Sequence, residues 1–334
     1  MKTERLDEHK RKEKLEELLR DVNGLLNPAE LKAAASFKQN KYPVVMITGC
    51  ARSGTTLLLQ WLAGTGAFCY PTNMLSRFYG APHIGAKIQL MLTKHDFNKE
   101  IFDFQEEVPF HSNLGKTRGA LAPNEFWYFW RRFFHYGDIQ YLNKEDLRSV
   151  DSQLFLSELA AIEAVFDKPL AMKAMIINWN IPFLLSIMDK ALVIFMKRRP
   201  FYNIQSMLEA RMKYYGDIKP WYSFKPPEYA DLKDRDPFEQ VAGQVYHTNL
   251  AVEEAMKGIE DSRRLEISYE AFCAHPEQVF HRIADKLSQQ GYTIGIPYMG
   301  PKHFKNTDSV RMSHEDCKKI KAAYKNFSGD EISI

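Results

Sequence analysis

The chain has 334 residues, 45% of them hydrophobic and 26% charged, which is an ordinary globular composition able to bury a sizeable core. This composition excludes a disordered chain, four cysteines exclude a disulfide scaffold, and the absence of any apolar run of about 18 residues predicts no membrane-spanning helix. The 45 basic and 42 acidic residues leave a net charge of only +3, so we expect no nucleic-acid binding and a local pocket for any anion.

Residues 1–40 are predicted to form a helical N-terminal extension. Leucines recur at helical spacing from Leu15 to Leu26 on a highly charged background, and Asn27-Pro28 is expected to end this helix or start the next one. The apolar stripe fits a helix packed on the rest of the chain or a short dimerising helix, so a homodimer is one expectation. The N-terminus shows no apolar signal region, which predicts a cytoplasmic protein.

Four short apolar runs after residue 40 have the pattern of buried parallel strands, and they cover residues 44–48, 170–175, 191–196 and 265–269. Helical patterns lie between them, at residues 55–62, 152–166, 237–258 and 276–289. This alternation predicts one α/β domain over residues 41–334, with a central parallel β-sheet flanked by helices.

The first predicted strand runs directly into Gly49-Cys50-Ala51-Arg52-Ser53-Gly54-Thr55-Thr56. A strand, a loop bracketed by glycines and a helix start together form an anion cradle, because backbone N–H groups and the helix N-terminus point at the anion. The spacing is that of a P-loop, except that Thr55 stands where the P-loop lysine belongs. Since that lysine reaches the outer phosphates of a nucleoside triphosphate, this loop suits a 5′-phosphate better, and we expect no metal.

The third predicted strand runs into Lys197-Arg198-Arg199-Pro200, with Ser206 about two helical turns further on. A magnesium-binding strand of a P-loop enzyme would end in aspartate, whereas this one ends in three cations. An arginine at a strand end with a hydroxyl nearby favours a second phosphate site. The alternative is that these basic residues are simply solvated.

The two motifs together resemble the sulfotransferases that use 3′-phosphoadenosine 5′-phosphosulfate (PAPS). The resemblance implies that Arg52, Ser53, Gly54, Thr55 and Thr56 hold the 5′-phosphosulfate end of this co-substrate. It also implies that Arg198 and Ser206 hold the 3′-phosphate. The family carries a strand lysine about two dozen residues before the second motif, and Lys173 lies 25 residues before Arg198.

The resemblance implies sulfuryl transfer from PAPS to an acceptor hydroxyl, with Arg52 and Lys173 neutralising charge on the bridging oxygen and leaving phosphate. A general base is also needed, but the position where cytosolic relatives have histidine is Met175, and residues 70–80 contain no acid, with Asn73 and Arg77 there instead. We therefore predict Glu125 as the base.

The residue pattern around Glu125 also fits an acid in the first turn of a helix, and His111 is a second candidate for the base. Near the C-terminus, Lys302, Lys305 and Arg311 form a late basic loop of the kind with which relatives complete the nucleotide site.

The acceptor is expected to bind to insertions at about residues 70–150 and 212–235, each of which holds an aromatic-rich segment. The segment at residues 125–136 fits either a buried core helix or a pocket wall, and residues 214–229 have the pattern of a long loop that could close over a site. Sugars, lipids, small alcohols or phenols, and peptides are all compatible acceptors, with a glycan or glycolipid weakly favoured, and peripheral membrane contact stays open. Two alternatives are a P-loop kinase or NTPase and a non-catalytic protein that binds 3′-phosphoadenosine 5′-phosphate (PAP).

Overall fold

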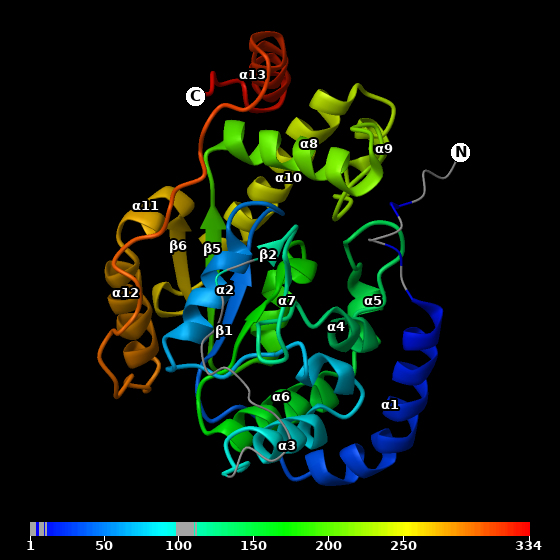
Figure 1. The fold of residues 1–334 in the computed structure, drawn as a ribbon, viewed down its shortest axis with the longest axis vertical. Helices are drawn as coiled ribbons and strands as arrows, with labels where there is room; N and C mark the ends of the chain where they lie inside the picture. The colour runs from blue at the N-terminus through cyan, green and yellow to red at the C-terminus, as the bar shows by residue number, and fades with distance from the viewer. Residues whose placement is uncertain (1–4, 7–9, 11, 98–109, 111) are drawn as a thin grey trace.

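The computed structural model describes residues 5–6, 10, 12–97, 110 and 112–334 (Figure 1). Its main sheet has four parallel strands in the order β4 (Ala171–Lys173), β1 (Val44–Thr48), β5 (Ala191–Lys197) and β6 (Arg264–Ser268). A separate two-stranded hairpin consists of β2 (Ser112–Asn113) and β3 (Lys116–Thr117). The predicted fold class, a central parallel sheet flanked by helices, is confirmed.

Helices cover the sheet and its carboxyl edge. The long ones are α1 (Glu13–Ala34), α2 (Thr55–Gly64), α3 (Pro82–Leu92), α6 (Ser152–Phe166), α8 (Pro200–Tyr215), α10 (Pro237–Lys257), α12 (Pro276–Gln289) and α13 (His314–Ser328). The shorter ones are α4 (Trp127–Phe133), α5 (Lys144–Arg148), α7 (Ile181–Ile187), α9 (Tyr229–Leu232), α11 (Tyr269–Ala274) and the 3₁₀ turns η2 (Leu75–Phe78), η3 (Met175–Ile177) and η4 (Asp261–Arg263).

The two faces of the sheet bury different residues of the same strands, because successive side chains of a strand point to opposite faces. Val44 and Met46 pack with α4, α6 and α7 on one face, whereas Val45 and Ile47 pack with α2, α11 and α12 on the other. A third apolar cluster joins α8, α10 and α13. Burial on both faces explains why the strands read as continuous apolar runs.

The predicted strands are all present, with small differences at their ends. Tyr269 was predicted to finish the fourth strand but begins α11 instead, because the Ser268 hydroxyl accepts the backbone N–H of Ala271 at 3.1 Å and so caps the helix. The run at residues 170–175 forms a shorter strand, because its last residue, Met175, belongs to η3.

The first helix does not end at Asn27-Pro28, contrary to the sequence-based expectation; α1 continues to Ala34. Side chains on both sides of the proline bind the neighbouring segment and compensate for the hydrogen bond that proline removes. Asn27 donates to the Gly80 carbonyl at 2.8 Å, and the buried Glu30 carboxylate accepts the backbone N–H groups of His83 and Ile84 at the start of α3. The helix thus packs against the main body, while a role in dimerisation and the division at residue 40 stay predictions.

The carboxyl ends of the strands meet at one edge of the sheet. From β1 the chain proceeds to β4 on one side and later to β5 on the other, so the loops after these strands leave a crevice between them. The loop after β1, Lys173 at the end of β4, Arg198 after β5 and Tyr269 after β6 are all brought to this edge. The fold therefore gathers both predicted phosphate motifs in one place.

Candidate active site

The loop between β1 and α2 depends on two glycines with positive φ. Gly49 has φ 131°, and a Cβ atom there would lie 2.5 Å from the Met196 carbonyl oxygen. Gly54 has φ 101°, and a Cβ atom there would lie 2.5 Å from the Tyr269 ring. Each contact is too short for any side chain, so the two glycines are required for the close approach of the loop to its neighbours.

Three buried side chains from later elements hold the carbonyl groups of this loop. The Asn178 amide donates to the Gly49 carbonyl at 2.9 Å, Asn203 donates to the Ala51 carbonyl at 2.8 Å, and Arg198 donates to the Arg52 carbonyl at 2.9 Å. With these carbonyls engaged by donors, the N–H groups at the start of α2 are left for an anion. Sequence reasoning missed Asn178 and Asn203, because neither asparagine carries a signal by itself: Asn178 lies five residues after Lys173, and Asn203 is an unassigned position inside the second phosphate motif.

Ser53 offers an independent test of whether a ligand fits the loop. Its hydroxyl oxygen is fully buried and has no hydrogen-bond partner among the described residues. An unsatisfied buried hydroxyl costs free energy, but a bound anion could reach this atom only if the loop shifted, because the side chain has no exposed surface. The fit of a phosphate or sulfate oxygen therefore rests on the N–H groups at the start of α2 and on Arg52, Thr55 and Thr56, which line the neighbouring cavity.

A cavity of about 490 Å³ opens beside the loop and collects most of the predicted site residues. The predicted residues that line it are Arg52, Gly54, Thr55, Thr56, Glu125, Lys173 and Arg198. Ser53 and Ser206 lie next to it without lining it. Residues far apart in the sequence thus line one cavity.

Lys173 and Glu125 form an ion pair at the centre of this cavity. The Lys173 ammonium donates to Glu125 Oε1 and, at 3.1 Å, to the Thr56 hydroxyl. The lysine side chain is only 5% exposed, whereas that of Glu125 is 23% exposed and so reaches the cavity. Glu125 precedes α4 rather than lying in its first turn, which makes the helix-acid alternative wrong.

The neighbours of this pair hold it in place. The Trp130 indole donates to the Lys173 carbonyl at 3.0 Å, and Phe126, next to Glu125, adopts the left-handed conformation with φ 57°. Such a conformation is uncommon for a bulky residue and persists only where the surroundings enforce it. The backbone on either side of the carboxylate is therefore fixed by its neighbours.

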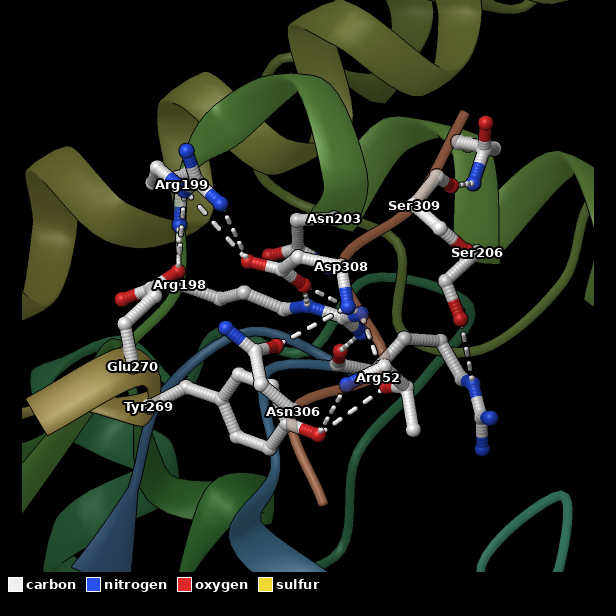
Figure 2. Close-up of polar contacts among 12 residues, drawn as sticks. Arg52, Arg198, Arg199, Asn203, Ser206, Tyr269, Glu270, Asn306, Asp308 and Ser309 are labelled. Atoms are coloured by element: carbon white, nitrogen blue, oxygen red, sulfur yellow. Dashed lines mark hydrogen bonds and ion pairs between the residues drawn. The ribbon is translucent and has the colours of Figure 1, made fainter. Parts of the chain in front are cut away.

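The second predicted phosphate site lies next to the loop, and its arginines already have partners within the chain (Figure 2). Arg52 Nε donates to the Ser206 hydroxyl at 3.2 Å. Arg198 is engaged by Asp308, a residue that sequence reasoning passed over within the late basic loop. Lys305 lines the cavity as expected, but Arg311 turns away and pairs with Glu209 at 2.7 Å.

Aromatic side chains also line the cavity. Trp127 and Phe224 pack with ring centroids 5.3 Å apart, and Tyr222 lies beside them. Burial raises the pKa of Tyr222 to about 12, so its hydroxyl can donate a hydrogen bond but does not act as a base near neutral pH. Both sequence-based readings of residues 125–136 hold in part, because Trp127 faces the cavity while Phe129 and Trp130 are core residues.

Three other sequence candidates have different outcomes. Met175 packs against the Thr55 hydroxyl, whose oxygen lies 3.3 Å from its sulfur, and Asn73 holds the hairpin by donating to the Gly119 carbonyl at 2.9 Å. His111, the second candidate for the base, lies outside the described residues.

In the described part of the chain, no cluster of three or more His, Cys, Asp or Glu side chains could hold a metal, and no helix is long and apolar enough to cross a membrane.

Gly115 lets the β2–β3 hairpin close over Glu125, and we predict that Gly115→Ala lowers kcat about 10-fold or more, since small misplacements of reacting groups are costly. A Cβ atom at this position would lie 3.2 Å from Glu125 Oε1, and φ is +86°. Steady-state kinetics checks the effect. Gly119→Ala is the matched control, because Gly119 also has a positive φ but a Cβ atom there would approach only Ala122, at 3.9 Å. Equal losses in the two variants would contradict the prediction.

Comparison with known proteins agrees with this architecture. The geometry defines a P-loop-like α/β protein. A family model described as the sulfotransferase family matches residues 43–290, most of the chain, and the chain therefore belongs to the sulfotransferase family. A search of curated proteins found no match.

Solved structures of sulfotransferases align with this chain at low sequence identity. The sulfotransferase STF9 from Mycobacterium avium aligns with a TM-score of 0.52 and 14% identity, covering 95% of this chain and 77% of that chain. STF1 from Mycobacterium tuberculosis H37Rv gives 0.49 and 13%, covering 81% and 75%. The sulfotransferase domain of the olefin synthase from Synechococcus PCC 7002 gives 0.40 and 17%, covering 75% and 74%. Identities this low support the shared fold and nothing finer.

Proposed function

We propose that this sulfotransferase takes its sulfuryl group from PAPS and transfers it to an acceptor hydroxyl. The observation that carries this proposal is the convergence of a phosphate loop without the P-loop lysine, a buried lysine and a carboxylate in one cavity. The cation of a P-loop kinase lies in the loop, at the position of Thr55, whereas here it comes from the end of a neighbouring strand as Lys173. That arrangement suits a phosphosulfate better than a triphosphate.

In the proposed reaction the acceptor oxygen attacks sulfur, the S–O bond to the 5′-phosphate breaks, and PAP leaves with the bond electrons. Negative charge accumulates on the bridging oxygen and the phosphate during this step. Lys173 and Arg52 would stabilise that charge, while Thr55, Thr56 and the N–H groups of α2 would orient the phosphate. The acceptor proton must leave at the same time, and the exposed face of the Glu125 carboxylate is placed to take it.

We further propose that the acceptor is a carbohydrate-containing molecule. The lining of the cavity offers the rings of Trp127 and Phe224 together with Tyr222. Flat rings beside a hydroxyl donor suit the apolar face and the polar edge of a sugar. A lipid-linked glycan would fit the same chemistry.

Trp127→Ala should raise the KM for the acceptor about 10-fold, because a stacking ring contributes on the order of 1–2 kcal/mol. The KM for PAPS should change by less than about 2-fold, since Trp127 belongs to α4 and packs on Phe224 rather than forming part of the phosphate loop. Initial-rate kinetics with each substrate varied in turn makes the measurement. Tyr141→Ala, a change at a half-exposed position outside the cavity, serves as the control. A rise in the KM for PAPS alone would contradict this assignment.

The proposed function is tested by sulfate transfer from ³⁵S-labelled PAPS to a panel of glycans, glycolipids, phenols, alcohols and peptides, with PAP binding measured by calorimetry. Transfer to any hydroxyl acceptor supports the proposal. Metal-dependent ATP binding without PAP binding would instead favour a kinase or NTPase. Tight PAP binding without transfer to any acceptor would favour a non-catalytic nucleotide-binding protein.

A further inference from the structure

The guanidinium of Arg198 already holds an anion from its own chain. Its Nε and Nη2 atoms lie 2.8 and 2.7 Å from Oδ1 of Asp308, so both nitrogens of one edge point at the same carboxylate (Figure 2). The other oxygen of Asp308 lies 3.3 Å from Nη2 of Arg199. The Asp308 side chain is completely buried, and that of Arg198 is 5% exposed.

Most of the remaining donors of Arg198 are also used. Nη1 donates to the Arg52 carbonyl at 2.9 Å, Nη2 also donates to the Thr307 hydroxyl at 3.2 Å, and the guanidinium lies 4.7 Å from the ring centroid of Tyr269. Four of the five N–H groups are thus engaged, and the one left on Nη1 is not a complete edge of the guanidinium. A phosphate that binds Arg198 through two parallel hydrogen bonds must therefore take the place of Asp308.

Charge leads to the same conclusion. Arg198 and Arg199 carry two positive charges, and Asp308 and Glu270, which lies 3.7 Å from Arg199, carry two negative ones. These four charges cancel, so Arg198 and Arg199 together offer little net attraction to a phosphate monoester that carries nearly two negative charges. Arg52, whose Nε donates to Ser206, is a further cation beside them. A phosphate placed beside the Asp308 carboxylate would meet strong repulsion in this buried setting.

The segment that carries Asp308 is fixed on both sides. Before it, the hydroxyls of Thr307 and Tyr269 are 2.9 Å apart, and the Asn306 side chain accepts the Asp308 N–H at 2.9 Å. After it, Gln205 donates to the Ser309 carbonyl at 2.9 Å. These contacts hold the Asp308 carboxylate against Arg198. They also oppose its displacement by a ligand.

We propose that Asp308 is a specificity-determining residue: its carboxylate competes with the nucleotide 3′-phosphate for Arg198, so that donor binding exchanges one anion for the other. This inference rests on the proposed PAPS donor. Two consequences follow. First, PAP binds more tightly than adenosine 5′-phosphate, which lacks the 3′-phosphate, but by a smaller factor than if Arg198 had no carboxylate partner. Second, the return of Asp308 to Arg198 favours release of PAP after transfer.

The test compares calorimetric Kd values of PAP and adenosine 5′-phosphate for the full chain and for Asp308→Asn. The asparagine keeps the size of the side chain and removes its charge, so Kd for PAP should fall about 10-fold or more, while Kd for adenosine 5′-phosphate should change less than about 2-fold. Glu270→Gln is the matched control, because it removes a charge beside Arg199 without a contact to Arg198; Kd for PAP should change less than about 3-fold.

Equal or weaker PAP binding by Asp308→Asn, with wild-type PAP binding intact, would overturn the inference and leave the proposed function standing. Absence of PAP binding by every variant and by the wild type would overturn both. Crystal structures of the wild-type protein with each nucleotide decide the matter even if Asp308→Asn does not fold. The inference requires Asp308 to leave Arg198 in the PAP complex and to remain there in the complex with adenosine 5′-phosphate; any other placement contradicts it.

Discussion

Lys173→Met is expected to lower kcat for sulfuryl transfer about 10²–10³-fold, the usual loss when one preorganised donor to developing charge is removed. We propose Lys173 as a cation that neutralises charge on the leaving phosphate, and its ammonium contacts both Thr56 and Glu125. Methionine matches its length and apolar stem, so packing against β1 is preserved. The partner left behind, Glu125, reaches the cavity and can be solvated. The measurement is single-turnover transfer from labelled PAPS.

The matched control for this prediction is Lys190→Met, which removes an exposed lysine at the start of β5 and should leave kcat within about 2-fold. The KM for PAPS separates two roles of Lys173. A loss confined to kcat indicates contact with charge that develops in the transition state, whereas a loss confined to KM would show that the lysine only binds the donor. The second outcome would contradict the assignment of Lys173 as a catalytic residue.

The strands, the phosphate loop and the order of the main helices could be predicted because their signals are local. A strand buried on both faces is a continuous apolar run, as at Val44–Thr48, and the loop that follows it carries its glycines at fixed spacing. Each of these features is defined by residues close together in the chain. Lys173 carries no such local signal; the family resemblance implies it, as a strand lysine about two dozen residues before the motif that contains Arg198.

The contacts that complete the site could not be predicted, because they join residues far apart in sequence. Glu125 and Lys173 are 48 residues apart, and Arg198 and Asp308 are 110 apart. The Asp308 segment follows the basic residues Lys302 and Lys305, so its composition indicated a cationic loop, yet an acid reaches the arginine. Likewise, the passage of α1 through Pro28 depends on Asn27 and Glu30 binding a distant segment. Tertiary contacts override local propensity in each case.

Glu125→Gln is expected to lower kcat about 10²–10⁴-fold, the range found when a positioned general base is removed. Glutamine has nearly the same shape and its amide oxygen can still accept the hydrogen bond from Lys173, so the geometry around Thr56 should persist. Affinity for PAP should therefore change less than about 3-fold. Pre-steady-state kinetics with a saturating acceptor measures the chemical step directly.

A general base and a residue that only positions Lys173 make different predictions about acceptor acidity. Neighbouring fluorine makes a sugar hydroxyl more acidic, and a more acidic hydroxyl needs less help to lose its proton. If Glu125 takes the proton, the deficit of Glu125→Gln shrinks along a series of fluorinated acceptors. If Glu125 only holds Lys173, the deficit of Glu125→Gln is small and stays constant along the series, because glutamine still accepts the hydrogen bond from Lys173. The double variant then loses no more than Lys173→Met alone, because Glu125 would act only through the lysine.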